Sequence, residues 1–357
     1  MLHFKPHFHP ATRRRAAPRR SHQRGMTLVE WMVSITIGLI LLAGLTGLIA
    51  RQSSAQSELE KSSRQIENGR YAMQLLNEDV QMAGYYGEFS NVGSLAVPSA
   101  LPDPCVVTVS AIEAAMVFPV QGYDAPTGAL STCIAAADHV AGTDILVVRR
   151  VEPATVTVAA AASAAGGQVY LQSGLTASGL EFTKKMGTGA DAAGTSVFTL
   201  FKKDRATLAD LRRFLVHIYF VSPCSVPVGS SCSGAADGGK PIPTLKVLEL
   251  SSSGAMTTTP LVEGIDNMQI DDGLDSNGDG APEGAYVTSP ALADWPNVMA
   301  LQVHLLARNN ESTAGFTDTK VYNLGVAGST TATNDGFKRR VFSQLIRVVN
   351  PSARRDQ

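Results

Sequence analysis

Residues 24–51 read RGMTLVEWMVSITIGLILLAGLTGLIAR and decide how the rest of the chain is interpreted. From Trp31 to Ala50 there is no charged residue, and at about 1.5 Å per residue a helix of this length crosses the hydrocarbon core of a bilayer. One carboxylate, Glu30, lies just ahead of the apolar run, where a charge close to lipid is costly unless it has a partner. The stretch therefore predicts a membrane-spanning helix with one acidic residue near its amino-terminal end.

The residues ahead of this helix are strongly basic. Lys5 and six arginines precede Met26, and no acidic residue does. Positive charge beside an apolar helix is typical of the cytoplasmic side, which leaves the bulk of the chain outside the inner membrane. A nucleic-acid patch is one alternative. A secretory signal peptide cut near Ala43 or Ala50 is another, although the apolar run is longer than the usual 7 to 15 residues.

The segment Gly25-Met26-Thr27-Leu28-Val29-Glu30, followed by an apolar helix, resembles the class III signal of type IV pilins and type II secretion pseudopilins. The resemblance implies that a prepilin peptidase cuts after Gly25, that Met26 becomes the methylated amino terminus, and that Glu30 is the carboxylate used in assembly. Met26 departs from the commoner phenylalanine. A carboxylate about 4 Å from a cationic amino terminus gains on the order of 4 kcal/mol at an effective dielectric of 20. The alternative is a helix-start glutamate that the helix dipole favours.

The helix is predicted to continue well beyond the membrane. After Arg51 the sequence becomes amphipathic, with no proline or turn signal until Gly84, and apolar residues recur every seven positions. We predict one helix of about 55 residues, with a coiled-coil seam as the alternative. The expected organisation is a cleaved leader at 1–25, the long helix at 26–84 with its transmembrane part at 31–50, and a globular head at 85–357. The apolar positions are Leu59, Ile66, Met73 and Val80.

A narrower resemblance covers several stretches of the chain, namely Gly69–Ala72, Leu75-Leu76, Glu78-Asp79, Met82–Gly87, Val262–Gln269 and Arg339–Ser343. These stretches resemble PilW-type minor pilins, and the resemblance implies a minor pilin that helps start or cap a type IV pilus. Its implied partners are other minor pilins, the major pilin, prepilin peptidase and the inner membrane, with the head in the periplasm. A minor pseudopilin of type II secretion is one alternative, and a signal-anchored periplasmic binding protein with no filament role is another.

The head carries the alternating pattern of β-strands. Between Arg213 and Ser222, for example, large apolar residues occupy every second position. We therefore predict an α+β, pilin-like fold, in which the second half of the long helix packs on an antiparallel sheet with disulfide-stapled loops. Residues 89–142 are proline-rich and are expected to form an irregular insertion. The expected strands are 144–151, 154–159, 197–201, 213–222, 244–250, 267–271, 298–308 and 340–349.

All four cysteines lie beyond the membrane helix. An even number of cysteines in an oxidising periplasm indicates two disulfides. Three pairings are possible, and the sequential one closes the shortest loops: Cys105 with Cys133, and Cys224 with Cys232. No pair has the CxxC spacing of a zinc or redox site.

The chain without its first 25 residues is acidic, with 23 basic and 31 acidic residues. A nucleic-acid binder needs a basic face, and the main basic cluster lies in the part predicted to be removed. We therefore expect no nucleic-acid partner.

One segment has the opening of a calcium loop. Asp275-Ser276-Asn277-Gly278-Asp279-Gly280 matches DxNxDG, in which carboxylate and amide oxygens converge on a hard cation. The twelfth position is Tyr286 rather than the usual glutamate, and Glu283 at the ninth position is the expected substitute, acting through a water. An ordinary turn is the alternative.

No enzyme is predicted from this sequence. The three histidines of the head, His139, His217 and His304, have no ligand spacing and are expected to be sheet or surface residues. The sequence contains no GxSxG, HExxH, GxxxxGK[ST] or GxGxxG motif. No cofactor is expected, apart from the calcium that residues 275–283 suggest.

Overall fold

The structure is a computed structural model that describes residues 25–126, 133–164, 166–194, 197–229 and 231–355. The leader predicted at residues 1–25 lies outside the described residues, except for Gly25. The chain divides into two compact units, residues 1–57 and residues 58–357. The second unit, together with the part of the long helix that belongs to it, is called the head below.

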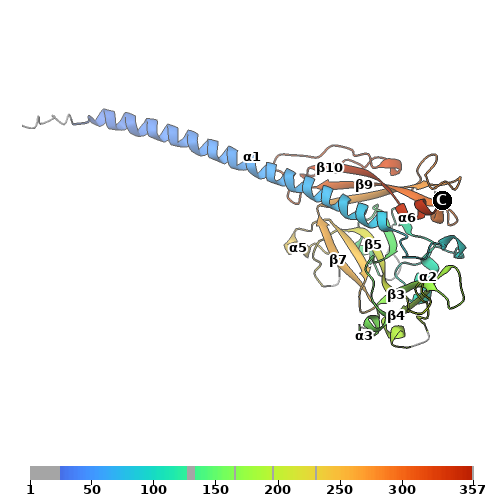
Figure 1. Ribbon diagram of the computed structural model, residues 1–357. Coiled ribbons are helices and arrows are strands. Elements are labelled where there is room, and N and C mark those ends of the chain that lie inside the picture. The colour runs from blue at the N-terminus through green and yellow to red at the C-terminus, as the bar shows by residue number, and fades with distance from the viewer. Residues whose placement is uncertain (1–24, 127–132, 165, 195–196, 230, 356–357) are drawn as a thin grey trace, which may run out of the picture. The chain divides into compact units, whose positions relative to one another are not determined.

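Helix α1 spans Leu28–Met82 and has 55 residues, which confirms the long amino-terminal helix (Figure 1). Its first half is the one described segment that is long and apolar enough to cross a membrane. The helix ends just before Gly84, whose positive φ of 71° suits glycine. The chain turns there, and the Gly84 N–H donates to the carbonyl of Arg149 over 2.9 Å.

The head buries only the carboxy-terminal half of the predicted stripe. Met73 and Val80 are buried, but Leu59 is 72% exposed, and burial begins at Gln65. A strict seven-residue repeat drifts by about 20° per repeat around a straight helix of 3.6 residues per turn, so a flat partner cannot cover every position of the stripe. The buried residues are Gln65, Gly69, Ala72, Met73, Leu76, Asp79 and Val80.

The head contains two antiparallel sheets where one was predicted. The larger has seven strands in the order β1-β2-β5-β3-β4, with β6 pairing with β5 and β7 pairing with β6. The smaller has three strands in the order β10-β9-β8. The strands are β1 Val120–Tyr123, β2 Ile145–Val151, β3 Val169–Leu175, β4 Phe182–Thr188, β5 Leu211–Ser222, β6 Thr244–Leu250, β7 Met256–Glu263, β8 Ile265–Leu274, β9 Val298–Arg308 and β10 Arg339–Arg347.

Strand β5 is the centre of the larger sheet. It pairs with β2 along one edge, and with β3 and then β6 along the other. Its alternation confirms the sequence pattern, because Phe214 and Ile218 enter one core cluster while Tyr219 and Val221 enter another. The second of these clusters also contains residues of α1, β8, β9 and β10, so the helix and both sheets share one core.

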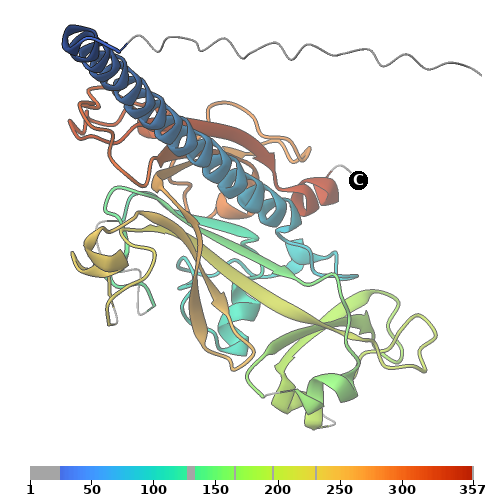
Figure 2. The ribbon, with the colours of Figure 1, turned by 90° about the vertical axis from the view of Figure 1, so that its left-hand side faces the viewer.

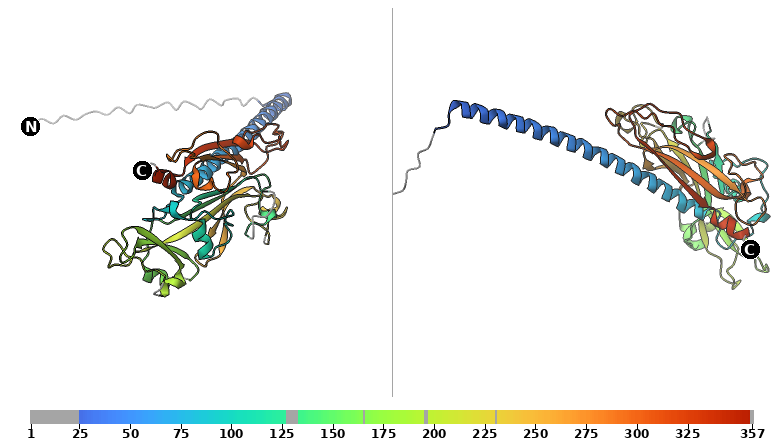
Figure 3. Two further views of the ribbon diagram at one scale, coloured as in Figure 1. Left: turned by 90° about the vertical axis from the view of Figure 1, so that its right-hand side faces the viewer. Right: turned by 90° about the horizontal axis from the view of Figure 1, so that it is seen from above.

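Short helices occupy several connections. In Figures 1 and 2, β3, β4 and α3 lie together at one end of the head, away from β9 and β10. Figure 3 shows α6 beside the carboxy-terminal end of α1, where Arg354 donates to the carbonyl of Gly84 over 3.0 Å. The helices are α2 Val109–Ala115, α3 Val158–Ser163, α4 Gly189–Ala193, α5 Ala236–Gly239 and α6 Val349–Arg355.

Two predicted strands are wrong. Residues 154–159 lead into helix α3, because Thr157 caps the helix by accepting from the Ala160 N–H at 3.1 Å and alanines follow. Residues 197–201 form only isolated bridges at Phe201. The insertion at 89–142 is also more regular than predicted, since it contains α2 and β1. Four strands were not predicted, namely β1, β3, β4 and β7.

Candidate functional site

The amino-terminal signal residues lie at the start of α1. Gly25 and Met26 precede the helix, and Glu30 is in its first turn, where its N–H donates to the hydroxyl of Thr27 over 3.3 Å. Every residue from Gly25 to Ala50 is exposed. Among the described residues of this chain, Glu30 has no ion-pair partner. The processing and assembly roles of Gly25, Met26 and Glu30 stay predictions.

A buried carboxylate joins α1 to the larger sheet. Asp79 Oδ1 accepts from Arg150 Nε at 2.6 Å, and its Oδ2 lies 2.8 Å from His217 Nδ1 and accepts from the Tyr219 hydroxyl at 2.9 Å. Burial alone would raise the pKa of Asp79, but the hydrogen bond and charge of His217, together with Arg150, lower that pKa to about 2. Asp79 is therefore ionised, and it fixes the helix to β2 and β5.

The smaller sheet binds the other side of the buried helix face. A Cβ at Gly69 would lie only 2.2 Å from the ring of Phe342 on β10, so glycine lets the helix and strand approach closely. Gln65 donates to the carbonyls of Ala307 and Lys338, each over 2.8 Å. Polar side chains of α1 thus satisfy backbone groups that the helix would otherwise cover.

Arg339, at the start of β10, is the centre of a second charge cluster. Its guanidinium binds Asp266 at 2.7 Å, Asp335 at 2.7 Å and Asp318 at 3.2 Å. Burial alone would lower the pKa of Arg339, but the three carboxylates raise it above its usual value. The cluster ties β8 and β10 to the long connection 309–338.

That connection is also bonded to α1 at the first residue of the head. Glu58 accepts from Lys338 at 2.7 Å and from the Thr313 hydroxyl at 2.7 Å. The hydrogen bonds from Lys338 and then Thr313 lower the pKa of Glu58 to about 2. The helix is therefore held at Glu58, Gln65, Gly69 and Asp79.

The cysteines form the sequential pairs. Cys105 bonds to Cys133 and Cys224 bonds to Cys232, and the described residues contain no free cysteine. The first pair closes the 89–142 insertion, and the second closes the loop between β5 and α5.

Three carboxylates of the predicted calcium loop come together. One oxygen each of Asp275, Asp279 and Glu283 lies within 4.8 Å of the others. The carboxylate of Asp275 already accepts from the Gly280 N–H at 2.9 Å and from Arg355 at 2.8 Å. Asn277 accepts from the Asp279 N–H at 2.9 Å, as in an ordinary Asx turn. Oxygen donors of this kind suit calcium, but a bound ion would have to replace the Arg355 contact.

Two histidines lie in strands, as expected, but His139 is buried in a bend after a short 3-10 helix and is neither a sheet nor a surface residue. Each of the three has a hydrogen-bond partner. His217 bonds to Asp79, and His304 on β9 lies 2.7 Å from the Ser343 hydroxyl and 3.3 Å from Asp271. His139 lies 3.0 Å from the Thr143 hydroxyl. The clusters of Asp79 and Arg339 were not predicted from the sequence. A charged residue on the buried face of a predicted helix, as Asp79 is, was the available signal.

Comparison with known proteins gives matches at both ends of the chain. A family model described as the prokaryotic N-terminal methylation motif matches residues 20–46. A second, described as type IV pilus-assembly protein W, matches residues 228–350, which include β6 to β10 and the Arg339 cluster. No curated protein matches the chain significantly.

Among solved structures, the chain is similar to a type IV-like pilin from Thermus thermophilus. The two share 15% sequence identity over 38% of this chain and 79% of that one, with a TM-score of 0.21. The methylation motif at the start of α1 and the PilW match over β6 to β10 support a type IV pilus minor pilin of the PilW type.

Proposed function

We propose that this minor pilin helps to initiate or cap type IV pilus assembly at the inner membrane, after a prepilin peptidase has cut behind Gly25. The observation that carries the proposal is the apolar, exposed first half of α1 with a single carboxylate at its start. Large side chains there are bare in the isolated chain, with Leu28 exposed at 78% and Ile40 at 71%. An apolar surface of this extent needs cover, which lipid gives before assembly and other pilin helices give afterwards.

Glu30 is proposed to select those helices. Cutting behind Gly25 would leave a cationic amino terminus on Met26, about one helical turn from the carboxylate. In a filament the amino terminus of a neighbour can take that place, and the attraction at about 4 Å is on the order of 4 kcal/mol at an effective dielectric of 20. Other minor pilins and the major pilin are the proposed partners. The head would then lie in the periplasm before assembly and in the pilus afterwards.

The test is complementation of a deletion strain with Glu30→Val. This variant should insert and be cut normally, because it removes a charge from the membrane and leaves Gly25 in place. It should nevertheless fail to restore the normal number of surface pili, and Glu30→Asp should be intermediate. Processing is scored by mass spectrometry of the amino terminus and by immunoblot, and pili are scored by shearing. Glu67→Gln, an exposed carboxylate change on the same helix, is the matched control and should behave as wild type.

Two results would contradict the proposal. Normal piliation with Glu30→Val would make Glu30 a simple helix-start residue. An amino terminus beyond Ala43 would show cleavage by an ordinary signal peptidase, and would leave a periplasmic protein without the filament helix.

A further inference from the structure

Residues 152–213 differ in charge from the rest of the head. This segment contains β3, β4, α3 and α4, and we call it the basic lobe. It has seven basic and five acidic residues, whereas the remainder of residues 26–357 has sixteen basic and twenty-six acidic. A net positive charge on one lobe of an otherwise acidic protein attracts anions to that lobe.

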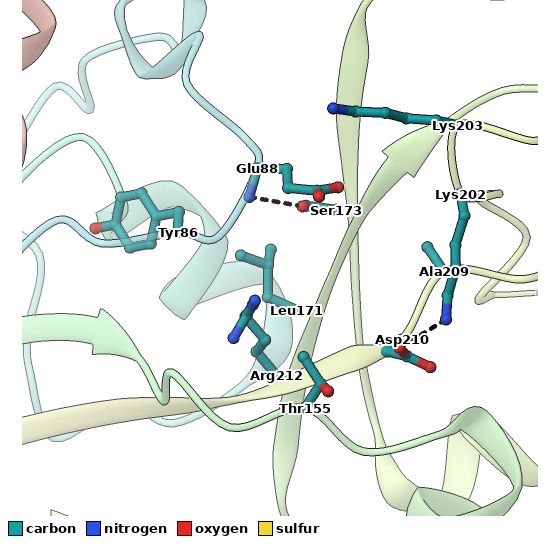
Figure 4. A pocket seen from close by; sticks show the side chains of 10 residues that line it. All are labelled: Tyr86, Glu88, Thr155, Leu171, Ser173, Lys202, Lys203, Ala209, Asp210 and Arg212. Carbon is teal, nitrogen blue, oxygen red and sulfur yellow. Dashed lines mark hydrogen bonds and ion pairs between the residues drawn. The ribbon is translucent and has the colours of Figure 1, made fainter.

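The basic lobe forms most of a pocket of about 400 Å³, which is within the usual size range of small-molecule sites (Figure 4). The floor is apolar, because Leu171 and Ala209 are buried beneath it. The rim is polar and carries three cations and two carboxylates. The rim residues are Glu88, Thr155, Ser173, Lys202, Lys203, Asp210 and Arg212.

The cations of the rim are not all neutralised by the carboxylates. Lys202 pairs with Asp210 at 2.9 Å. Arg212 donates instead to the carbonyl of Glu152 over 3.3 Å and lies over the ring of Tyr85, with 5.5 Å to the ring centre. These contacts orient the Arg212 side chain without cancelling its charge.

Lys203 is the most available cation. Its ammonium lies 5.9 Å from the centre of the Phe182 ring, and it forms no ion pair with any described residue. Across the pocket in Figure 4, the Glu88 N–H donates to the Ser173 hydroxyl over 3.0 Å, which leaves the hydroxyl hydrogen of Ser173 able to donate to a ligand. The Glu88 carboxylate beside it forms no ion pair with the residues that the structure describes, and it can accept hydrogen bonds from hydroxyl groups. The pocket thus offers cations, hydroxyl acceptors and an apolar floor together.

We propose that this pocket binds a sugar acid, a ligand with one carboxylate and several hydroxyl groups. Lys203 and Arg212 would attract the carboxylate, Glu88 and Asp210 would accept hydrogen bonds from the sugar hydroxyls, and Leu171 would contact the C–H face of the ring. A doubly charged phosphate fits less well, because it meets two carboxylates at the rim. A neutral sugar fits less well because it leaves Lys203 without an anion.

The experiment uses the full processed chain in detergent, with D-glucuronate as the probe, titrated by saturation-transfer NMR. D-glucose and inorganic phosphate are the comparison ligands. Glucuronate should bind in the millimolar range and more tightly than either. Lys203→Gln should weaken glucuronate binding by about fivefold, as expected for one partly exposed charge contact, and should leave glucose unchanged.

A matched control distinguishes binding in this pocket from general electrostatic attraction to the basic lobe. Lys185→Gln removes the same charge from β4 of the same lobe, outside the pocket, and should leave glucuronate binding unchanged. Glu88→Gln should reduce the preference for glucuronate over phosphate. Absence of glucuronate binding at tens of millimolar would overturn the proposal. So would equal losses in the Lys185 and Lys203 variants, or phosphate binding as tight as glucuronate binding.

Discussion

Replacing Asp79 by alanine tests whether the contact between α1 and the larger sheet depends on one buried charge. The side chain of Asp79 is 6% exposed, and those of Arg150 and His217 are 17% and 13% exposed. Asp79→Ala would leave Arg150 without its carboxylate and the Tyr219 hydroxyl without its acceptor. Removing one partner of a buried ion pair costs about 3–5 kcal/mol, mostly because the other charge stays buried.

The pKa of Asp79 gives a second measure of the same interaction. Lowering this pKa from 3.8 to about 2 corresponds to about 2–3 kcal/mol of stability at neutral pH. Because the folded-state pKa is lowered, this stability is present above the unfolded pKa and is lost as the pH falls from about 4 to about 2. Asp79→Asn, which keeps one acceptor for Tyr219, should therefore lose about 2–3 kcal/mol at pH 7, which is less than alanine loses.

The assay is urea unfolding of the full chain in detergent, followed by the fluorescence of Trp295, which is buried in the core shared by the helix and both sheets. Glu78→Gln is the control, since Glu78 is the exposed neighbour of Asp79 and should change stability by less than about 0.5 kcal/mol. The difference between wild type and Asp79→Ala should shrink as the pH falls below 4. A loss as small as that of the control, or one that does not change with pH, would refute the reasoning.

Three further predictions concern the head. Burial raises the pKa of Asp144 to about 7, so between pH 4 and 7 the folded chain keeps a proton that the unfolded chain has lost. The free energy of unfolding should therefore fall by up to about 4 kcal/mol as the pH rises from 4 to 7, and Asp144→Asn should flatten this slope in urea unfolding. Peptide mapping without reductant should show both disulfides, and free thiols in periplasmic material would contradict the pairing. Replacing Cys105 and Cys133 by serine should lower the free energy of unfolding by roughly 2–4 kcal/mol. Calorimetry should detect calcium binding to residues 275–283 with a dissociation constant of about 10⁻⁴ to 10⁻³ M, and tighter binding in Arg355→Ala. If neither protein releases heat with calcium, the segment is only an ordinary turn.

The elements predicted correctly are those with a strong local signal. Helix α1 has an uninterrupted pattern with no proline, and strands such as β2, β5 and β9 have long apolar runs. The strands that were missed lack such runs. β4 contains two lysines and β7 contains Pro260, and both are edge strands that need only one partner. Their structure depends on pairing with distant segments, which no local pattern reports.

The contacts of the candidate site could not be predicted from the sequence for a related reason. The amino-terminal signal is contiguous, so its residues could be named from the sequence alone. The Asp79 cluster joins residues 71 and 138 positions apart. The Arg339 cluster joins Asp266, 73 positions away, to two aspartates of the 309–338 connection. Partners at such distances are determined by sheet register, which the sequence pattern did not provide.

The stretches that resemble PilW-type pilins have a shared physical role in the structure. Gly69 and Asp79 lie on the buried face of α1, and Asp266 and Arg339 hold the sheet and the connection that cover it. Apolar packing alone would let a helix slide or rotate on a flat sheet with little change in buried area, because the hydrophobic effect is not directional. A close glycine contact and buried ion pairs permit one register, since any other leaves a charge without a partner. We infer that these residues fix the register of residues 58–82 of the helix on the two sheets that cover them.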